Sequence, residues 1–371
     1  MNFTRRRFLA TAAAALPTCA AGASESAFTF ALLGDLHYDK LDHHDFAWLE
    51  AHHAGDLSQI RNYSRITAEL TPRLFDAVRE SVTESGAGFV LQVGDVVEGL
   101  CGTEDLSVRQ NREAIAFIAS ARLGVPFVFT KGNHDVTGDG ATEAFKEVFH
   151  PFLSTQIASF TNSGKLATAN YSFGHRDALF CFFDAYDKDS LDVLEAMLAK
   201  RTARHCFVII HPPVVPYGAR STWHVFSSER DKAKRERLLT MLGKQNAFVL
   251  GGHIHKYNTI CRATPGGGRF VQFALSSVIN TAEPKPATEL DQLSDYTPDQ
   301  IRVEPKHSPD TEPQRRAVYV AEAPFVKAFT YADLPGHAVV SVEGDRVEAT
   351  MYAGVGRKKY RSVELSRLMH A

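Results

Sequence analysis

The stretch Lys131-Gly132-Asn133-His134-Asp135 follows residues 125–130, an apolar run that predicts a buried strand. Gly132 permits a sharp turn, which brings the side chains of Asn133 and His134 to the end of that strand. The amide oxygen of Asn133 is a neutral ligand atom, and the His134 imidazole can carry a proton near neutral pH. Because Gly-Asn is a common turn, the meaning of this pentapeptide depends on what ends the other strands.

Four other apolar runs end in residues of the same types. They are followed by Asp35-Leu36-His37, Gly94-Asp95, His211-Pro212-Pro213 and Gly252-His253-Ile254-His255. Asp35 and His37 alternate with Leu36, so both side chains point to the same side of an extended chain. Five strand ends that carry Asp, Asn or His predict a metal site at one edge of a sheet. Oxygen and imidazole ligands without thiolate suit Mn, Fe, Zn or Co and do not choose among them.

Taken in order, the blocks Asp-x-His, Gly-Asp, Gly-Asn-His-Asp, His and Gly-His-x-His resemble the calcineurin-like metallophosphoesterase superfamily. The resemblance extends over about residues 28–278. It implies a four-layer α-β-β-α sandwich of two mixed sheets, with the metal site where the strand ends meet. The residues themselves predict a layered α/β fold, because strands alternate with helices and are followed by late hairpins.

The resemblance implies two metal ions, which are divalent or trivalent. The first ion would be held by Asp35, His37, Asp95 and His255. The second would be held by Asp95, Asn133, His211 and His253. Asp95 is shared, because a carboxylate has two oxygens and can bridge.

Three further residues are considered for roles that do not involve binding metal. The resemblance makes His134 the group that protonates the leaving alkoxide or stabilises the transition state. Asp135 either orients His134 or caps the turn, and the sequence leaves both open. Glu98 either orients His134 or is a solvated loop carboxylate. Purple acid phosphatases have a tyrosine at this position and protein serine/threonine phosphatases an aspartate followed by Arg-Gly, so Glu98-Gly99 fits neither group.

These observations predict a metal-dependent phosphoric ester hydrolase. Its substrates would be phosphomonoesters or phosphodiesters of small molecules, attacked by a hydroxide that bridges the two ions. One alternative is a non-catalytic scaffold with the same fold, and a less favoured one is a nuclease. The formal net charge of −2 gives no basic field for nucleic acid, which is therefore not an expected partner.

The N-terminal segment predicts export. Thr4-Arg5-Arg6-Arg7-Phe8-Leu9 resembles a twin-arginine signal, and Ala21-Gly22-Ala23 offers a cleavage site, so residues 1–23 are expected to be a signal peptide. The translocase of that pathway would then be a partner, and the protein would be periplasmic or secreted. The apolar run 8–15 is short for a membrane span, so no transmembrane segment is expected in the mature chain. A basic tail or a membrane anchor is the alternative.

The rest of the chain divides by composition. Residues 27–280 are expected to form the catalytic domain, 281–336 a long surface loop with several prolines and acidic residues, and 337–371 a hairpin that completes the domain. Within 43–85 we expect one amphipathic helix. It is preceded by His43-His44 and His52-His53, which we expect in a solvated loop, with further metal ligands or a wall of the substrate pocket as the alternative. Tyr217, Arg220, Trp223 and His224 follow His211 and are candidates to line the substrate pocket, where an aromatic side chain could stack on a nucleobase or pack the loop down.

Overall fold

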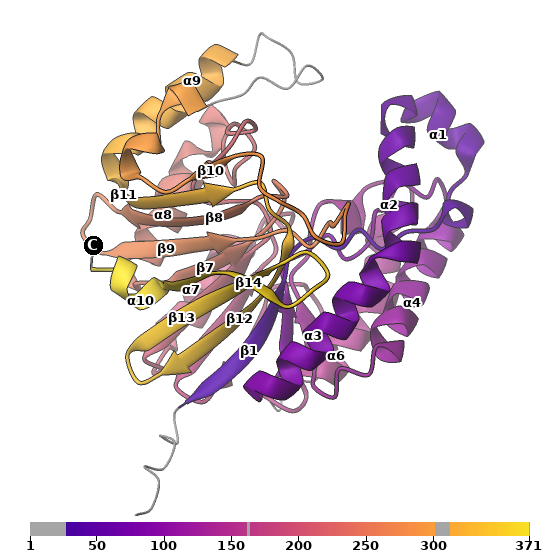
Figure 1. Cartoon of the computed structure of the whole chain (residues 1–371), viewed down its shortest axis with the longest axis horizontal. Helices are drawn as coiled ribbons and strands as arrows, with labels where there is room; N and C mark the ends of the chain where they lie inside the picture. Colours follow the sequence, from indigo (N-terminus) through magenta and orange to yellow (C-terminus); the bar gives the residue numbers. More distant parts are fainter. Residues whose placement is uncertain (1–26, 162–163, 301–311, 371) are drawn as a thin grey trace, which may run out of the picture.

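The computed structural model describes residues 27–161, 164–300 and 312–370, and the predicted signal peptide lies outside this range. Two β-sheets lie face to face and helices cover their outer sides (Figure 1). The predicted four-layer α-β-β-α sandwich is therefore confirmed. No helix among the described residues combines the length and the apolar character needed to cross a membrane.

The first sheet has six strands in the order β14-β13-β12-β1-β2-β3. Its strands are β1 (Phe28–Leu33), β2 (Val90–Gln92), β3 (Phe127–Phe129), β12 (Gly336–Glu343), β13 (Arg346–Ala353) and β14 (Lys358–Glu364). β1, β2 and β3 are parallel, whereas β12 pairs antiparallel with β1. The C-terminal ends of β1, β2 and β3 therefore lie at one edge of the sheet.

The second sheet has eight strands in the order β10-β11-β8-β9-β7-β6-β5-β4. Its strands are β4 (Tyr171–His175), β5 (Ala178–Phe183), β6 (His205–Ile210), β7 (Phe248–Gly251), β8 (Tyr257–Ala263), β9 (Arg269–Ala274), β10 (Glu289–Leu290) and β11 (Val326–Ala332). β5, β6, β7 and β9 run parallel, so β6 and β7 also end at a common edge. Antiparallel pairing joins β4 to β5 and β8 to β9.

The described residues form ten α-helices, several of which pack on the outer faces of the sheets. They are α1 (Phe46–His52), α2 (Leu57–Glu69), α3 (Thr71–Ser85), α4 (Glu104–Ser120), α5 (Ala141–Ala144), α6 (His150–Ile157), α7 (Ser190–Ala199), α8 (Lys232–Lys244), α9 (Glu312–Glu322) and α10 (Leu365–Leu368). α3 and α6 pack on the first sheet, and α7 and α8 pack on the second. Residues 43–85 contain three α-helices, and the amphipathic helix expected there is divided into α2 and α3, because Pro72 lacks the backbone N–H that a continuous helix would use and lies in the first turn of α3.

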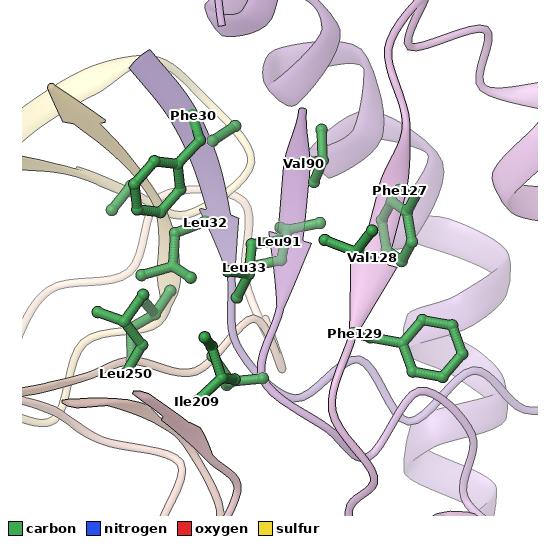
Figure 2. Close-up of a cluster of buried hydrophobic side chains, with 14 of the residues drawn as sticks. Phe30, Leu32, Leu33, Val90, Leu91, Phe127, Val128, Phe129, Ile209 and Leu250 are labelled. Atoms are coloured by element: carbon green, nitrogen blue, oxygen red, sulfur yellow. The ribbon is translucent and has the colours of Figure 1, made fainter. Parts of the chain in front are cut away.

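Aromatic side chains of the two sheets fill the space between them. Phe30 lies 5.4 Å from Phe180 and 5.5 Å from Phe207, measured between ring centroids, and both ring pairs are edge to face. These contacts hold β1 of the first sheet against β5 and β6 of the second. On the opposite face of the first sheet, Phe129 points toward the helices, 5.1 Å from Phe149 (Figure 2). Burying large apolar side chains on both faces of the parallel strands fixes how the two sheets sit against each other.

Residues 281–336 differ from the surface loop that composition predicts. This segment contains β10, α9 and β11, and β11 pairs with β8 inside the second sheet. Of the loop that was expected, residues 301–311 lie outside the described range. The hairpin expected after residue 337 is present as β12 and β13, and β14 extends it by one strand.

Candidate metal centre

All seven predicted ligands follow the C-terminal ends of parallel strands. Asp35 and His37 follow β1, Asp95 follows β2 and Asn133 follows β3 in the first sheet. In the second sheet, His211 follows β6, and His253 and His255 follow β7. The structure brings all seven together where the edges of the two sheets meet, as the sequence predicts.

Four of these side chains form a first group of potential ligands. One ligand atom from each of Asp35, His37, Asp95 and His255 lies within 4.8 Å of every other. The Nε2 atoms of His37 and His255 are 2.9 Å apart. Nε2 of His37 lies 3.6 Å from Oδ2 of Asp95, and Nε2 of His255 lies 3.7 Å from Oδ1 of Asp35. This is the set expected for the first ion.

A second group consists of Asp95, His211, His253 and Asn133. One ligand atom from each of the first three lies within 4.8 Å of the others. The amide oxygen of Asn133 is 2.9 Å from Nδ1 of His253 and 3.2 Å from Nε2 of His211. This is the set expected for the second ion.

Asp95 is the residue that both groups share, and a single oxygen makes the connection. Its Oδ2 lies 3.0 Å from Nε2 of His211 in the second group and 3.6 Å from Nε2 of His37 in the first. Its Oδ1 accepts a hydrogen bond of 2.8 Å from the backbone N–H of His134. The expected bridge used both carboxylate oxygens of Asp95, whereas in the structure Oδ2 alone faces both groups.

The residues around Asp35 fit a bound cation. Oδ1 of Asp35 accepts from the backbone N–H of His253 at 2.8 Å, but Oδ2 is buried and has no hydrogen-bond partner. A buried carboxylate oxygen without a partner is unfavourable unless a ligand satisfies it. Gly252 packs against the same carboxylate, since a Cβ there would lie 2.6 Å from Oδ2. At Gly132 a Cβ would lie 2.1 Å from Oδ1 of Asp95.

The backbone at four of the ligands is strained. His37, Asp95, His253 and His255 have φ values of 46°, 56°, 73° and 58°, in the left-handed region that non-glycine residues rarely occupy. Each such residue costs about 1–3 kcal/mol, which the surrounding structure has to offset. Strain concentrated in one ligand set is typical of a functional site.

Burial and neighbouring carboxylates set the pKa values of the histidine ligands. Burial lowers the pKa of His253 and of His255 to about 3, so both imidazoles have lone pairs available for a metal at neutral pH. His211 differs: burial opposes its charge, but Asp95 and Asp35 raise its pKa to about 9. A cation that takes this place would displace the proton of His211, which couples metal affinity to pH.

Glu98 is buried and links His37 to His134, so the solvated-carboxylate interpretation is wrong. Its Oε2 accepts a hydrogen bond of 2.6 Å from Nδ1 of His37 and lies 3.3 Å from Nδ1 of His134. Nδ1 of His134 donates to the backbone oxygen of Glu98 at 2.8 Å. A carboxylate behind a ligating histidine fixes its tautomer and turns the other nitrogen toward the metal.

Asp135 contacts backbone rather than the His134 side chain. Oδ1 accepts from the N–H groups of Val96 and Val97 at 2.8 and 3.1 Å. Oδ2 accepts from the N–H groups of Gly132 and Asp95 at 2.8 and 3.1 Å. These four bonds favour the turn-capping interpretation, in which Asp135 fixes the loops that carry Asp95 and Asn133.

Helix α2 contributes two side chains that the sequence did not identify. The ring of Tyr63 stacks on His37 with 4.4 Å between centroids, and Gln59 donates to Oε1 of Glu98 at 3.1 Å. Both positions lie within residues 43–85, where the sequence predicts a loop and an amphipathic helix. No local pattern distinguishes them from ordinary helix residues, so the sequence carries no signal for this contact.

The loop after β6 divides into packed and exposed residues. Tyr217 is buried and its hydroxyl lies 3.3 Å from the backbone oxygens of Gly252 and Lys256, so it packs the loop down. His224 is also buried. Trp223 is 40% exposed, and its ring centroid lies 5.9 Å from that of His253. The Arg220 guanidinium lies over the indole at 4.7 Å.

The sequence profile described as "Calcineurin-like phosphoesterase" matches residues 28–257, which is more than half of the chain. Among curated proteins, none matches the sequence.

Several solved structures share the fold. A purple acid phosphatase from yellow lupin (Lupinus luteus) seeds is 11% identical with a TM-score of 0.51, over 94% of this chain and 56% of that one. A dimetal phosphatase from Danio rerio is 14% identical with a TM-score of 0.51, over 91% and 99% of the chains. GAP50, the anchor in the inner membrane complex of Plasmodium, is 13% identical with a TM-score of 0.50, over 92% and 89%. Likeness at these identities shows the fold alone.

Proposed function

Because the chain belongs to the calcineurin-like phosphoesterase family, we propose that it is a binuclear-metal phosphoesterase that hydrolyses phosphomonoesters or phosphodiesters of small molecules. The observation that supports this most strongly is the pair of ligand groups that share Oδ2 of Asp95 beside the unpartnered Oδ2 of Asp35. The native metals would be two ions from among Mn, Fe, Zn and Co.

Bound ions would supply positive charge to the phosphoryl oxygens and would lower the pKa of a bound water. Asp35, His37, Asp95 and His255 would hold one ion, and Asp95, Asn133, His211 and His253 the other. Gly94 keeps these groups close, because a Cβ there would lie 2.7 Å from Nδ1 of His211.

His134 is the proposed proton donor to the leaving oxygen. Its Nδ1–H is committed to the backbone oxygen of Glu98, so Nε2 is the nitrogen left to give up a proton. Burial opposes the charged imidazole, but the carboxylates of Glu98 and Asp95 raise the pKa of His134 above its ordinary value. A proton is therefore available near neutral pH, where general acid catalysis is most effective.

Export through the twin-arginine translocase to the periplasm or the medium is a second part of the proposal. Its support is the Arg5-Arg6-Arg7 motif followed by an apolar run. Replacing Arg5, Arg6 and Arg7 together with lysine should retain the protein in the cytoplasm. Cell fractionation measures where the variant accumulates. Normal export of the variant would contradict this assignment.

The alternative is a non-catalytic scaffold. It receives no specific support from the site, since all seven ligand positions carry side chains that can bind metal. A nuclease is not supported either, because the formal net charge is −2.

The decisive experiment is a phosphoester panel run in parallel with elemental analysis. It should contain p-nitrophenyl phosphate, bis-p-nitrophenyl phosphate, nucleotides, cyclic nucleotides, phospholipid head groups and single-stranded DNA. We expect the metal-loaded protein to hydrolyse at least one small phosphoester and the chelated protein none. A protein with two bound ions and no turnover on any ester would overturn the proposal in favour of the scaffold, and preferential cleavage of DNA would favour the nuclease.

A further inference from the structure

A groove of about 590 Å³ opens beside the second ligand group. Asn133 and His253 of that group lie in its wall, together with residues from the loops that follow β5 and β6. This volume is within the range of sites that hold small organic ligands. A substituent of a phosphoester that is bound at the ions would extend directly into it.

The groove contains the exposed aromatic side chains of the described chain. The exposed large hydrophobic residues among residues 27–161, 164–300 and 312–370 are Leu41, Tyr186, Trp223, Leu293 and Val320. The two aromatic ones, Tyr186 and Trp223, are 41% and 40% exposed, and both line this groove. They come from different loops, so one local packing preference does not account for both. Partly exposed aromatic side chains from two loops that meet beside a candidate catalytic centre indicate a binding surface.

The charges in the groove balance. Its charged residues are two lysines, Lys188 and Lys234, and two aspartates, Asp187 and Asp231. Lys234 pairs with Asp231 at 2.9 Å, and Asp187 accepts hydrogen bonds from Asn170 and from its own loop. Among the lining residues the lysines do not outnumber the aspartates, so they provide no surplus of positive charge for a second phosphate or a polyanionic chain. The groove therefore suits an uncharged group.

The indole of Trp223 has a defined position relative to the metal centre. The Arg220 guanidinium lies over the ring, 4.7 Å from its centroid. The same ring lies 5.9 Å from that of His253, with 45° between the ring planes. A cation over an indole contributes about 0.5–2 kcal/mol and restricts its orientation. The aromatic wall is thus held next to a proposed ligand of the second ion.

Resting on the proposed function, we propose that this groove is the subsite for the alcohol part of the phosphoester and that it selects an uncharged, flat aromatic group. Trp223 and Tyr186 supply the surface on which that group stacks. The group is either a simple arylmethyl ring or a nucleobase, since both present the same π face. Arg220 acts as a positioning residue through the indole.

The first test compares esters that differ in aromaticity and little else. Benzyl phosphate and cyclohexylmethyl phosphate both release a primary alcohol of similar size, and their methyl diesters extend the comparison if only diesters are hydrolysed. We expect higher kcat/KM for the benzyl ester. Trp223→Ala should lower that value by roughly tenfold, as expected for the loss of one aromatic stack, and should lower the value for the cyclohexylmethyl ester by a smaller factor. Thymidine 5′-phosphate in the same assay distinguishes a nucleoside from a simple aryl group.

Matched variants separate recognition from folding. Trp223→Phe should restore most of the preference, Tyr186→Ala should weaken it, and Val320→Ala, which removes an exposed apolar side chain on α9, should not change it. All variants should retain the metal content of the wild type. Equal kcat/KM for the two esters, or an equal loss on both in Trp223→Ala, would overturn this inference and leave the proposed function intact. Hydrolysis of neither ester nor of any panel member would instead overturn the proposed function.

A second test does not depend on turnover. The sequence has two tryptophans, Trp48 and Trp223, so a Trp48→Phe variant reports on Trp223 alone. We expect 4-nitrobenzylphosphonate, which is not hydrolysed, to quench this fluorescence saturably and benzylphosphonate to compete with it. Quenching that does not saturate, or competition by cyclohexylmethylphosphonate as strong as by benzylphosphonate, would overturn the aromatic subsite even if the protein hydrolyses phosphoesters.

Discussion

Two clusters of buried carboxylate and histidine lie close together in this protein, and they differ in how their polar atoms are satisfied. In the Asp39 cluster, Oδ1 of Asp39 accepts from His44 at 2.7 Å and Gln110 at 2.9 Å, and Oδ2 accepts from Ser64 at 2.6 Å. In the metal centre, Oδ2 of Asp35 has no partner. Both clusters combine buried carboxylates with histidines. The comparison shows that unpaired ligand atoms, rather than buried His and Asp as such, mark the place for a cation.

The Asp39 cluster also corrects an expectation. His43 and His44 were expected in a solvated loop, yet both are buried. His43 contacts Glu113 on α4 at 3.1 Å, and His44 contacts the backbone oxygen of Leu100 at 3.0 Å. They join the segment after β1 to the helical layer, which is a structural role.

The largest effect is expected at Asp95, which belongs to both ligand groups. Asp95→Ala should abolish tight binding of two ions and reduce phosphoester turnover to background, because Asp95 is the residue that the two ligand groups share. Elemental analysis after gel filtration measures the bound metal. Asp39→Ala is the matched control, since it also removes a buried carboxylate but should retain both ions. Full metal content in Asp95→Ala would refute the bridging assignment.

The next effect is expected at His134, which faces the centre without belonging to the proposed ligands. His134→Ala should keep two ions and lose about 10²–10⁴-fold in kcat, the usual contribution of a general acid. Steady-state kinetics on a phosphoester with a poor leaving group measures the loss, and His52→Ala provides an exposed histidine as control. The proposed role would be wrong if His134→Ala retained full turnover or lost its metal.

A smaller effect is expected at Glu98, which acts through His37. Glu98→Ala should weaken metal affinity or activity by about 10–100-fold, as is typical when the partner of a ligating histidine is removed. Glu98→Gln should recover part of this, because its amide oxygen can still accept the hydrogen bond from Nδ1 of His37. Competition titration with a metal chelator gives the affinities. If Glu98→Gln lost as much metal affinity as Glu98→Ala, the hydrogen bond that Glu98 accepts from His37 would not account for the effect.

The smallest effect is expected at the Asp39 cluster and appears in stability. His44→Ala should lower the free energy of unfolding by about 3 kcal/mol, since it leaves a buried carboxylate short of its partner, and should not change metal content. Burial opposes the charge of His44, but the hydrogen bond and charge of Asp39, with a further contribution from Glu98, raise its pKa above the ordinary 6.5. The stabilisation is therefore complete below that value and is lost as pH rises through the higher folded pKa.

Denaturant unfolding from about pH 6 to about pH 9 measures this dependence. The difference in unfolding free energy between wild type and His44→Ala should be larger at the acidic end. A difference that grows toward alkaline pH would contradict the assigned partner of His44.

The parts that sequence predicts well are those where local order carries the information. Each ligand follows a buried apolar run, and parallel strands deliver their C-terminal residues to one edge, so Asp35, Asp95 and Asn133 could be grouped from sequence alone. Tyr63 and Gln59 reach the site from α2 through tertiary packing, which no local pattern records. β11 was missed although it has seven residues, because its partner β8 lies more than sixty residues away in the sequence.

Anomalous X-ray diffraction from crystals of the metal-loaded protein tests the central claim most directly. The account predicts two anomalous peaks about 3.5–4 Å apart, one beside His37 and His255 and the other beside His211 and His253, with Asp95 between them. A single peak, or two peaks that do not both contact Asp95, would contradict it.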